Sequence, residues 1–344
     1  MTTRTATHAD SWYTGNGKQL SRQLDGWLSA VKPEPGENYT PPIIGCKAVI
    51  APHAGYSYSG PAAAWAYKSI DTTGMWVPSN CLGSCVSHSL MNNLRKRVFV
   101  LGPSHHVYLN GCALSKCKTY ATPIGNLSLD LETITELRST GSFSDMDVQT
   151  DEDEHSIEMH LPYVRKVFEG LDISIVPILV GAIDRETEVR FGRVIAPFLA
   201  REDTFCVVSS DFCHWGTRFS YTLYYPQPPP STAGAIRLSR GGPPPSADHP
   251  IHQSISALDH EAMELLTLPP SKASQAHHDF AEYLVRTKNT ICGRHPIGVL
   301  LGALSELEKE GRSAEIKWVR YEQSSKCFNV GDSSVSYASA YVKF

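Results

Sequence analysis

Four short runs of apolar residues, rich in β-branched or aromatic side chains, organise the first two thirds of the chain. Each run ends abruptly at Gly, Pro or Ser, and this pattern is typical of strands that are buried on both faces of a sheet. The expected strands are Lys47–Ala51, Arg97–Leu101, Ile173–Val180 and Thr204–Val208.

Helical spacing of apolar residues appears between and after these runs, where leucines and other large side chains recur every three or four positions. Each such pattern is ended by Pro or Gly, as expected at the end of a helix. The expected helices carry apolar faces at Leu20–Val31, Ile251–Leu266 and Val299–Leu307, and they are ended by Pro33, Pro269 and Gly311.

The C-terminal part alternates between apolar and polar positions twice, at Ile316–Arg320 and at Val335–Tyr341, which predicts two closing strands. Strands that alternate with helices predict an α/β protein, a three-layer αβα fold around a largely parallel or mixed central sheet. We expect one domain over residues 1–344 with inserted loops at about 72–93 and 225–250. The second segment holds two Pro-Pro-Pro runs, so it is expected to be a mobile loop that could dock an SH3-type partner.

Composition excludes several classes of protein. A formal charge of −4 and a pI near 6.4 provide no basic face for nucleic acid or an anionic membrane. The longest apolar stretch, around Ile297–Leu304, is far shorter than the ~20 residues needed to span a bilayer, so no membrane insertion is expected. Met1–Asp10 has no apolar core typical of a secretory signal. We therefore expect a cytoplasmic protein, with nuclear entry left open, whose nine irregularly spaced cysteines stay as thiols.

Polar motifs follow three of the four expected strands. His53 follows the first strand, His105 and His106 follow the second, and Asp211 and His214 follow the fourth. In open α/β sheets, ligands bind beyond the carboxyl ends of the strands. One histidine after a strand is more often structural than functional, but three such strand ends predict a shared site.

Cys292 lies just before the third expected helix, beside Arg294 and His295. A cysteine near a helix N-terminus and next to cationic groups is expected to have a lowered pKa and to be partly thiolate, the form that binds metals or attacks substrates. The alternative is a buried, inert cysteine, which is common.

The segment Asp151–Pro162 is a weaker candidate. Its two histidines are five residues apart and share a helix face poorly, whereas His155 and Glu158 are three apart and could share one. We interpret Asp151–Glu154 as a solvated, acidic helix start. His106, His155, Glu158 and Arg294 are grouped as residues that border a bound cofactor or support its ligands.

At these residues the sequence resembles the Memo (mediator of cell motility) family. The resemblance implies a fold like that of the class III extradiol dioxygenases, which hold non-haem Fe(II) with two histidines and a carboxylate. The two inserted segments depart from the pattern of the animal members. The matching segments are Ala9–Tyr13, Ala51–Tyr56, Leu101–Val107, Thr150–Pro162, Val208–Gly216, Asn289–Val299 and Ser333–Ala338.

The resemblance also implies roles for individual residues. His53 and His105 match the metal-site histidines of the family, and Cys292 matches its third ligand. Asp211 and His214 match pocket residues, and His214 resembles the acid–base histidine of the dioxygenases. Family members are described as binding copper or iron, supporting oxidant production and relaying growth-factor receptor signals to the cytoskeleton.

Donor chemistry separates the functional hypotheses. A carboxylate favours Fe(II) oxygenase chemistry, whereas a thiolate at Cys292 favours Cu(I) or zinc, with Fe(II) still compatible. The leading hypothesis is a redox-metal protein that uses Cu(I) or Fe(II). The second is a metal-independent signalling adaptor that binds phosphotyrosine peptides, with Arg294 near the phosphate. The third is a ring-cleaving, non-haem iron dioxygenase.

Overall fold

The computed structural model describes residues 2–36, 38–72, 96–231 and 234–344. The expected loop at about 72–93 lies outside the described residues except for its first position. Strands in the described ranges are β1 (Thr3–Arg4), β2 (Cys46–Ala51), β3 (Lys96–Pro103), β4 (Cys112–Ser115), β5 (Thr119–Tyr120), β6 (Leu127–Leu129), β7 (Phe143–Met146), β8 (Ile173–Val180), β9 (Thr204–Ser209), β10 (His214–Trp215), β11 (Leu223–Tyr224), β12 (Ile236–Arg237), β13 (Glu315–Gln323) and β14 (Ser334–Lys343).

Helices in the same ranges vary from one turn to four turns in length. The α-helices are α1 (Gly17–Ala30), α2 (Tyr56–Lys68), α4 (Leu131–Ser139), α5 (Val148–Asp153), α6 (His155–Glu158), α7 (Leu161–Val167), α8 (Arg185–Leu199), α9 (Ile251–Leu266), α10 (Ala273–Thr287) and α11 (Arg294–Lys309). No helix of the described segments is long and apolar enough to cross a membrane.

Twelve of the described strands form one mixed sheet, in the order β1-β5-β6-β8-β3-β9-β2-β14-β10, with β13 on β14 and the β4–β7 pair joined to β8. Its centre, β8-β3-β9-β2, is parallel and consists of the four strands that the apolar runs predict. The last two strands close the sheet as an antiparallel pair, β13 with β14, and β14 also pairs antiparallel with β2. The carboxyl ends of β2, β3 and β9 therefore lie next to one another.

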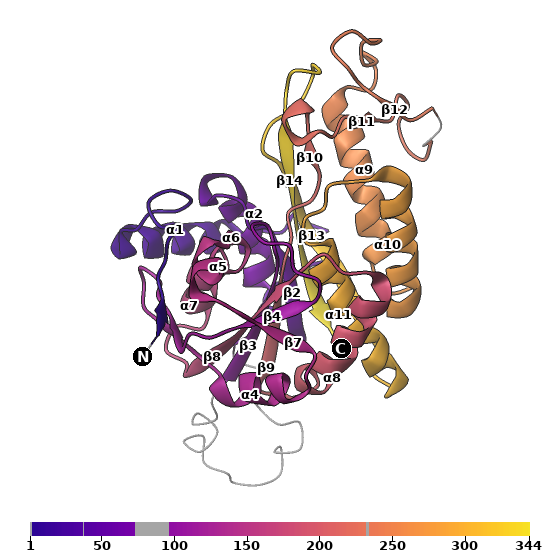
Figure 1. The fold of residues 1–344 in the computed structure, drawn as a ribbon. Coiled ribbons are helices and arrows are strands. Elements are labelled where there is room, and N and C mark those ends of the chain that lie inside the picture. The colour runs from indigo at the N-terminus through magenta and orange to yellow at the C-terminus, as the bar shows by residue number, and fades with distance from the viewer. Residues whose placement is uncertain (1, 37, 73–95, 232–233) are drawn as a thin grey trace.

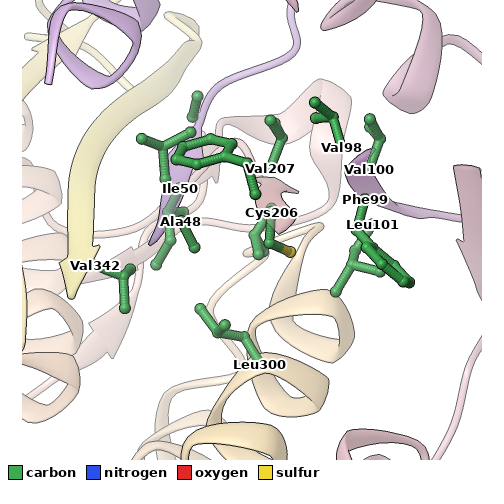
Figure 2. Close-up of a cluster of buried hydrophobic side chains, with 14 of the residues drawn as sticks. Ala48, Ile50, Val98, Phe99, Val100, Leu101, Cys206, Val207, Leu300 and Val342 are labelled. Carbon is green, nitrogen blue, oxygen red and sulfur yellow. The ribbon is translucent and has the colours of Figure 1, made fainter. Parts of the chain in front are cut away.

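Helices cover both faces of this sheet. Figure 1 shows α1, α2 and α5–α7 on one side and α8–α11 on the other, so the predicted three-layer αβα architecture is confirmed. Apolar side chains such as Ile50, Val100 and Val207 in the middle of the central strands are fully buried, and Leu300 of α11 points toward Ala48 and Cys206 (Figure 2). Full burial of one branched aliphatic side chain stabilises the fold by about 1.5–3 kcal/mol.

Glycines set the distance between α8 and α11. A Cβ atom on Gly192 would lie 2.5 Å from the backbone nitrogen of Ala303, and one on Gly302 would lie 2.9 Å from the Cα atom of Val189. These helices therefore pack backbone against backbone. This contact lies in the middle of α11, the helix that follows Cys292.

The predicted insertion at 225–250 has anchored parts. Ile236–Arg237 pairs with β11 as a two-stranded ribbon. Tyr225 and Leu238 are buried in a small second core with Trp215 and Ile255. This second core lies beside α9 and supports the strand that carries His214.

Candidate metal centre

His53 lies two residues after the end of β2 and is buried. Its Nδ1 lies 2.6 Å from the hydroxyl oxygen of Ser209, and that hydroxyl donates to the carbonyl of Ser156 at 2.8 Å. Because the hydroxyl proton is already used, the Ser209 oxygen accepts from His53 Nδ1–H. This tautomer leaves the lone pair on Nε2. Burial, followed by the nearby imidazoles of His105 and His155, lowers the pKa of His53 well below its usual value, so the ring is neutral.

His105 follows β3 and is held by a carboxylate. Its backbone N–H donates to Glu154 Oε2 at 2.7 Å, and its Nδ1 lies 2.9 Å from Glu154 Oε1. Burial opposes ionisation of Glu154, but the hydrogen bond from His105 and the neighbouring imidazoles outweigh it and hold the pKa at about 2. An ionised carboxylate only accepts hydrogen bonds, so Nδ1 carries the proton and Nε2 is free.

His155 begins α6 and stacks on His105, with ring centroids 4.5 Å apart. The indole of Trp12 covers its other side at 4.3 Å. Burial, then the nearby imidazole of His105, lowers the pKa of His155 to about 3. Ligand atoms of His53, His105 and His155 lie within 4.8 Å of one another, and no other set of three such donors in the described ranges meets this spacing. These three imidazoles could hold a metal ion.

Cys292 lies in the loop before α11 and contacts His53. Its Sγ lies 3.2 Å from His53 Nε2 and accepts the backbone N–H of Asp211 at 3.2 Å. The prediction of a lowered thiol pKa is wrong. Burial, then the Asp211 carboxylate, raises the pKa of Cys292 well above its usual value, and Arg294 only partly opposes them. A metal cation at the sulfur would supply the positive charge that a thiolate needs.

Asp211 and His214 continue the loop after β9. Asp211 Oδ1 accepts the backbone N–H groups of His53 at 2.8 Å and Ala54 at 3.3 Å, and burial raises the pKa of this carboxyl group while His214 opposes the shift. His214 Nδ1 lies 2.9 Å from the carbonyl oxygen of Phe212 and 3.1 Å from that of Thr290. Carbonyls only accept, so Nδ1 donates and Nε2 can take a proton.

A cavity of about 750 Å³ opens over these residues. His53, His105, His106, His155, Asp211 and His214 all line it, so the structure brings together six of the nine predicted site residues. The lining also includes Tyr58, Arg218 and Phe219, together with serines of the β13–β14 hairpin: Ser324, Ser325, Ser333 and Ser334.

The other three predicted residues lie elsewhere. Cys292 is behind His53 and does not line the cavity. Glu158 is fully buried and faces the N-terminal segment, where it accepts from Arg4 at 2.7 Å and Tyr13 at 2.7 Å. Arg294 lines a different cavity, together with His295.

Sequence reasoning missed three supporting residues: Glu154, Ser209 and Trp12. Asp151–Glu154 was interpreted as a solvated helix start, and this is wrong for its two ends because Asp151 and Glu154 are each 2% exposed. A metal-binding histidine at a strand end, such as His105, needs an acceptor for its second ring nitrogen. Glu154 could have been identified as a candidate acceptor because it is next to His155, another histidine of the predicted site.

Fold and site together define an αβα protein with a histidine-lined, metal-competent cavity at the carboxyl ends of parallel strands. Comparison with known proteins gives the family. The protein-family model described as Memo-like protein matches residues 4–341 of this chain. Protein MEMO1 of Xenopus laevis is 44% identical over 338 residues, covering 97% of this chain and 95% of that protein. Protein MEMO1 of Danio rerio is 43% identical over 341 residues, covering 98% and 96%. This chain therefore belongs to the Memo-like family.

A more distant relative and a solved structure also match. The protein memo-1 homolog of Caenorhabditis elegans is 38% identical over 339 residues, which are 98% of this chain and 81% of that protein. The crystal structure of an uncharacterized protein from Escherichia coli K12 aligns with 86% of this chain and 99% of its own, at a TM-score of 0.40 and 13% identity. At that score the likeness carries no argument.

Proposed function

We propose that this protein binds a redox-active metal, copper as Cu(I) or iron as Fe(II), through His53 and His105 with Cys292 as the third ligand. One observation carries the proposal. The Nδ1 atoms of His53 and His105 are hydrogen-bonded to Ser209 and Glu154, so each ring has its Nε2 lone pair available for a metal ion. Metal-binding histidines usually have such a fixed second nitrogen, and the donors present fit a soft or borderline metal ion.

Two donors compete for the third position. Cys292 lies 3.2 Å from His53 Nε2, and its sulfur favours Cu(I) or Zn(II). His155 belongs to the three-imidazole group, which suits zinc, copper or iron. We assign the third position to Cys292, as the family resemblance implies, and treat His155 as an additional donor. Binding by this set requires the Cys292 sulfur to move closer to His105, because the donor atoms of His53, His105 and Cys292 do not all lie within 4.8 Å of one another.

Copper or iron would supply one-electron redox chemistry when bound. The protein's own groups have separate tasks. Glu154 and Ser209 fix the ring orientation of the two histidines, and Asp211 fixes the backbone that carries His53. Nε2 of His214 can accept a proton in the cavity. We extend the proposal to oxidant production and cell signalling or motility, and this extension rests on the family resemblance alone.

A ring-cleaving dioxygenase has less support. That chemistry favours two histidines and a carboxylate around Fe(II). The donor group of the described residues contains three imidazoles and no carboxylate. Asp211, the acidic residue of the pocket, uses Oδ1 to accept two backbone N–H groups.

Metal analysis of protein purified without an affinity tag tests the main proposal. Elemental mass spectrometry is expected to find copper or iron bound in the unmodified protein. The content should fall sharply in Cys292→Ser and His105→Ala. His260→Ala, an exposed histidine on α9, is the matched control and should keep the metal. Unchanged copper and iron content in both site variants would show that the proposal is wrong.

A second candidate is a metal-independent adaptor that binds a phosphotyrosine peptide in the same cavity. Arg218 favours it because this exposed cation lines the cavity and lies 4.8 Å from the ring of Phe219. Arg294, the cation expected from the sequence, is not in this cavity. Calorimetry with metal-free protein should show binding of the phosphorylated peptide only, and Arg218→Gln should abolish it. Equal binding of the unphosphorylated peptide would contradict this function.

A further inference from the structure

A second cavity, of about 230 Å³, lies between the start of α8, the length of α10 and the start of α11. It shares no lining residue with the histidine-lined cavity. Neither the proposed metal ligands nor the proposed acid–base residues line it. The polar part of its lining consists of Arg185, Glu188, His277, Lys288, Arg294 and His295.

Glu188 is already fully engaged at the base of this cavity. Its Oε2 lies 2.6 Å from His277 Nε2, and its Oε1 lies 2.6 Å from His295 Nδ1. Burial opposes ionisation, but the two hydrogen bonds outweigh it and lower the pKa of this carboxyl group. A Cβ atom on Gly298 would lie 2.4 Å from the carboxylate, so α11 is shaped to fit it. The donor atoms of this trio do not meet the 4.8 Å spacing of a metal site.

Three cations therefore surround the cavity without a carboxylate of their own. Within the described ranges, Arg185, Lys288 and Arg294 make no ion pair with an acidic side chain. Arg185 Nη1 lies 2.7 Å from His278 Nδ1, and Arg294 Nη1 donates to a backbone carbonyl at 3.4 Å. With one carboxylate against three cations, the lining carries a charge of about +2 even when its histidines are neutral.

The remaining wall is apolar. It is formed by the side of α10 that carries Phe280, Leu284 and Val285, together with Ile183 before α8. Val285 is 62% exposed, an unusual position for a large aliphatic side chain next to three cations. The cavity is smaller than the roughly 300–1,000 Å³ of sites for drug-sized ligands, so it suits a fragment-sized molecule.

We propose that this cavity binds a small amphiphilic anion, a carboxylate or phosphate monoester that carries a short apolar chain. The anionic head is held by Arg185, Lys288 and Arg294, because charge-assisted hydrogen bonds from unpaired cations are the strong polar contacts here. The apolar chain covers Phe280 and Leu284. The proposal is independent of metal binding in the other cavity.

Two matched pairs of probes test the ligand class by saturation-transfer and titration NMR on the full chain. Hexanoate and hexyl phosphate are expected to bind at millimolar concentration or below. Hexanamide tests the need for charge, and inorganic phosphate tests the need for the apolar chain. Both controls should bind at least tenfold more weakly, which corresponds to about 1.4 kcal/mol.

Variants locate the binding. The double variant Arg185→Gln/Lys288→Gln removes two cations and leaves the hydrogen bonds of Glu188 with His277 and His295 intact. It should lower the affinity for hexanoate at least tenfold. Ala281→Phe, which fills the apolar side of the cavity, should abolish binding while all three cations remain. Lys309→Gln, at the exposed far end of α11, is the control and should change nothing.

Three results would overturn the proposal: no binding of either amphiphile, equal binding of hexanoate and hexanamide, or unchanged affinity in both cavity variants with retained thermal stability. Metal content of the same samples, measured in parallel, separates this test from that of the metal site.

Discussion

Replacing Arg4 by Met removes the buried cation that ties the N-terminal segment to the site. The Arg4 side chain is fully buried, and its guanidinium contacts Asp151 Oδ1 at 3.0 Å, Glu158 Oε2 at 2.7 Å and the Glu154 carbonyl at 2.9 Å. Met fills much of the same volume, so the change mainly leaves two carboxylates buried without their partner. Removing one partner from a buried ion pair destabilises a protein by about 3–5 kcal/mol, and we expect a loss in this range at neutral pH.

The destabilisation caused by Arg4→Met should be smaller at acidic pH than at pH 7. In the intact protein burial opposes ionisation of Glu158, but the hydrogen bond of His8 and the charge of Arg4 outweigh it and hold the pKa at about 2, against a usual value of 4.5. A lowered folded-state pKa gives stability that is complete above about pH 4.5 and is lost as the pH falls toward 2. Through Glu158 alone, lowering the pH from 7 to about 3.5 should lower the free energy of unfolding of the intact protein by about 1.4 kcal/mol. The Arg4→Met variant lacks the cation that lowers this pKa, so the difference in stability should narrow.

Urea unfolding followed by tryptophan fluorescence at pH 7 and at acidic pH measures both effects. Arg22→Met, an exposed arginine on α1, is the control and should change the free energy of unfolding by less than about 0.5 kcal/mol. A loss below about 1 kcal/mol in Arg4→Met would refute the reasoning, because the two carboxylates would then not depend on their cation. If the free energies of unfolding of the intact protein and of Arg4→Met differ as much at acidic pH as at pH 7, the assigned ionisation of Glu158 is refuted.

Three further predictions concern the metal site and the helices behind it. Glu154→Gln keeps the shape but weakens the acceptor of His105, and competition titration with a chromophoric Cu(I) chelator should show affinity lowered by about 10–100-fold; unchanged affinity would mean that Glu154 does not orient the ring. Metal at about 100 times its dissociation constant should stabilise the protein by about 2.7 kcal/mol, seen as a rise in Tm that a chelator reverses; no shift would contradict binding to the folded state. Gly192→Ala should destabilise the protein by about 1–3 kcal/mol in urea, because its new methyl group would meet the backbone of α11 at 2.5 Å; a neutral result would mean that the helices separate easily.

The sequence predicts the centre of the fold well because the parallel strands are buried on both faces. Ile173–Val180 was predicted with the bounds that the structure has, and the other three central strands differ by one to three residues in total. Short strands such as β5 and β6 have no pattern of their own, since two or three residues form a strand only through their neighbours. The sequence does not indicate helix α8 although Asp184 caps it, because the charged residue Glu188 lies on its buried face and Pro197 lies inside it.

The candidate site was predictable where chemistry follows a strand end, and less so where it depends on burial. His53, His105 and His214 could be grouped because parallel strands end at one edge. The pKa of Cys292 could not be predicted, since helix position and neighbouring charge are visible in a sequence but desolvation is not. Glu158 was placed with His155 by helical spacing, yet α6 is a single turn and Glu158 faces Arg4 instead.

The three strand-end histidines share a feature that does not depend on which metal binds. Nδ1 of His53 faces a hydroxyl whose proton is already donated, Nδ1 of His105 faces a carboxylate, and Nδ1 of His214 faces two carbonyls. These acceptors differ in chemistry and come from different segments, but each selects the same tautomer. Burial by itself would leave the tautomer free, so the acceptors are what direct three Nε2 lone pairs toward one region. Such an arrangement suits binding of a cation or transfer of a proton, and it would be an unfavourable way to fill a purely structural core.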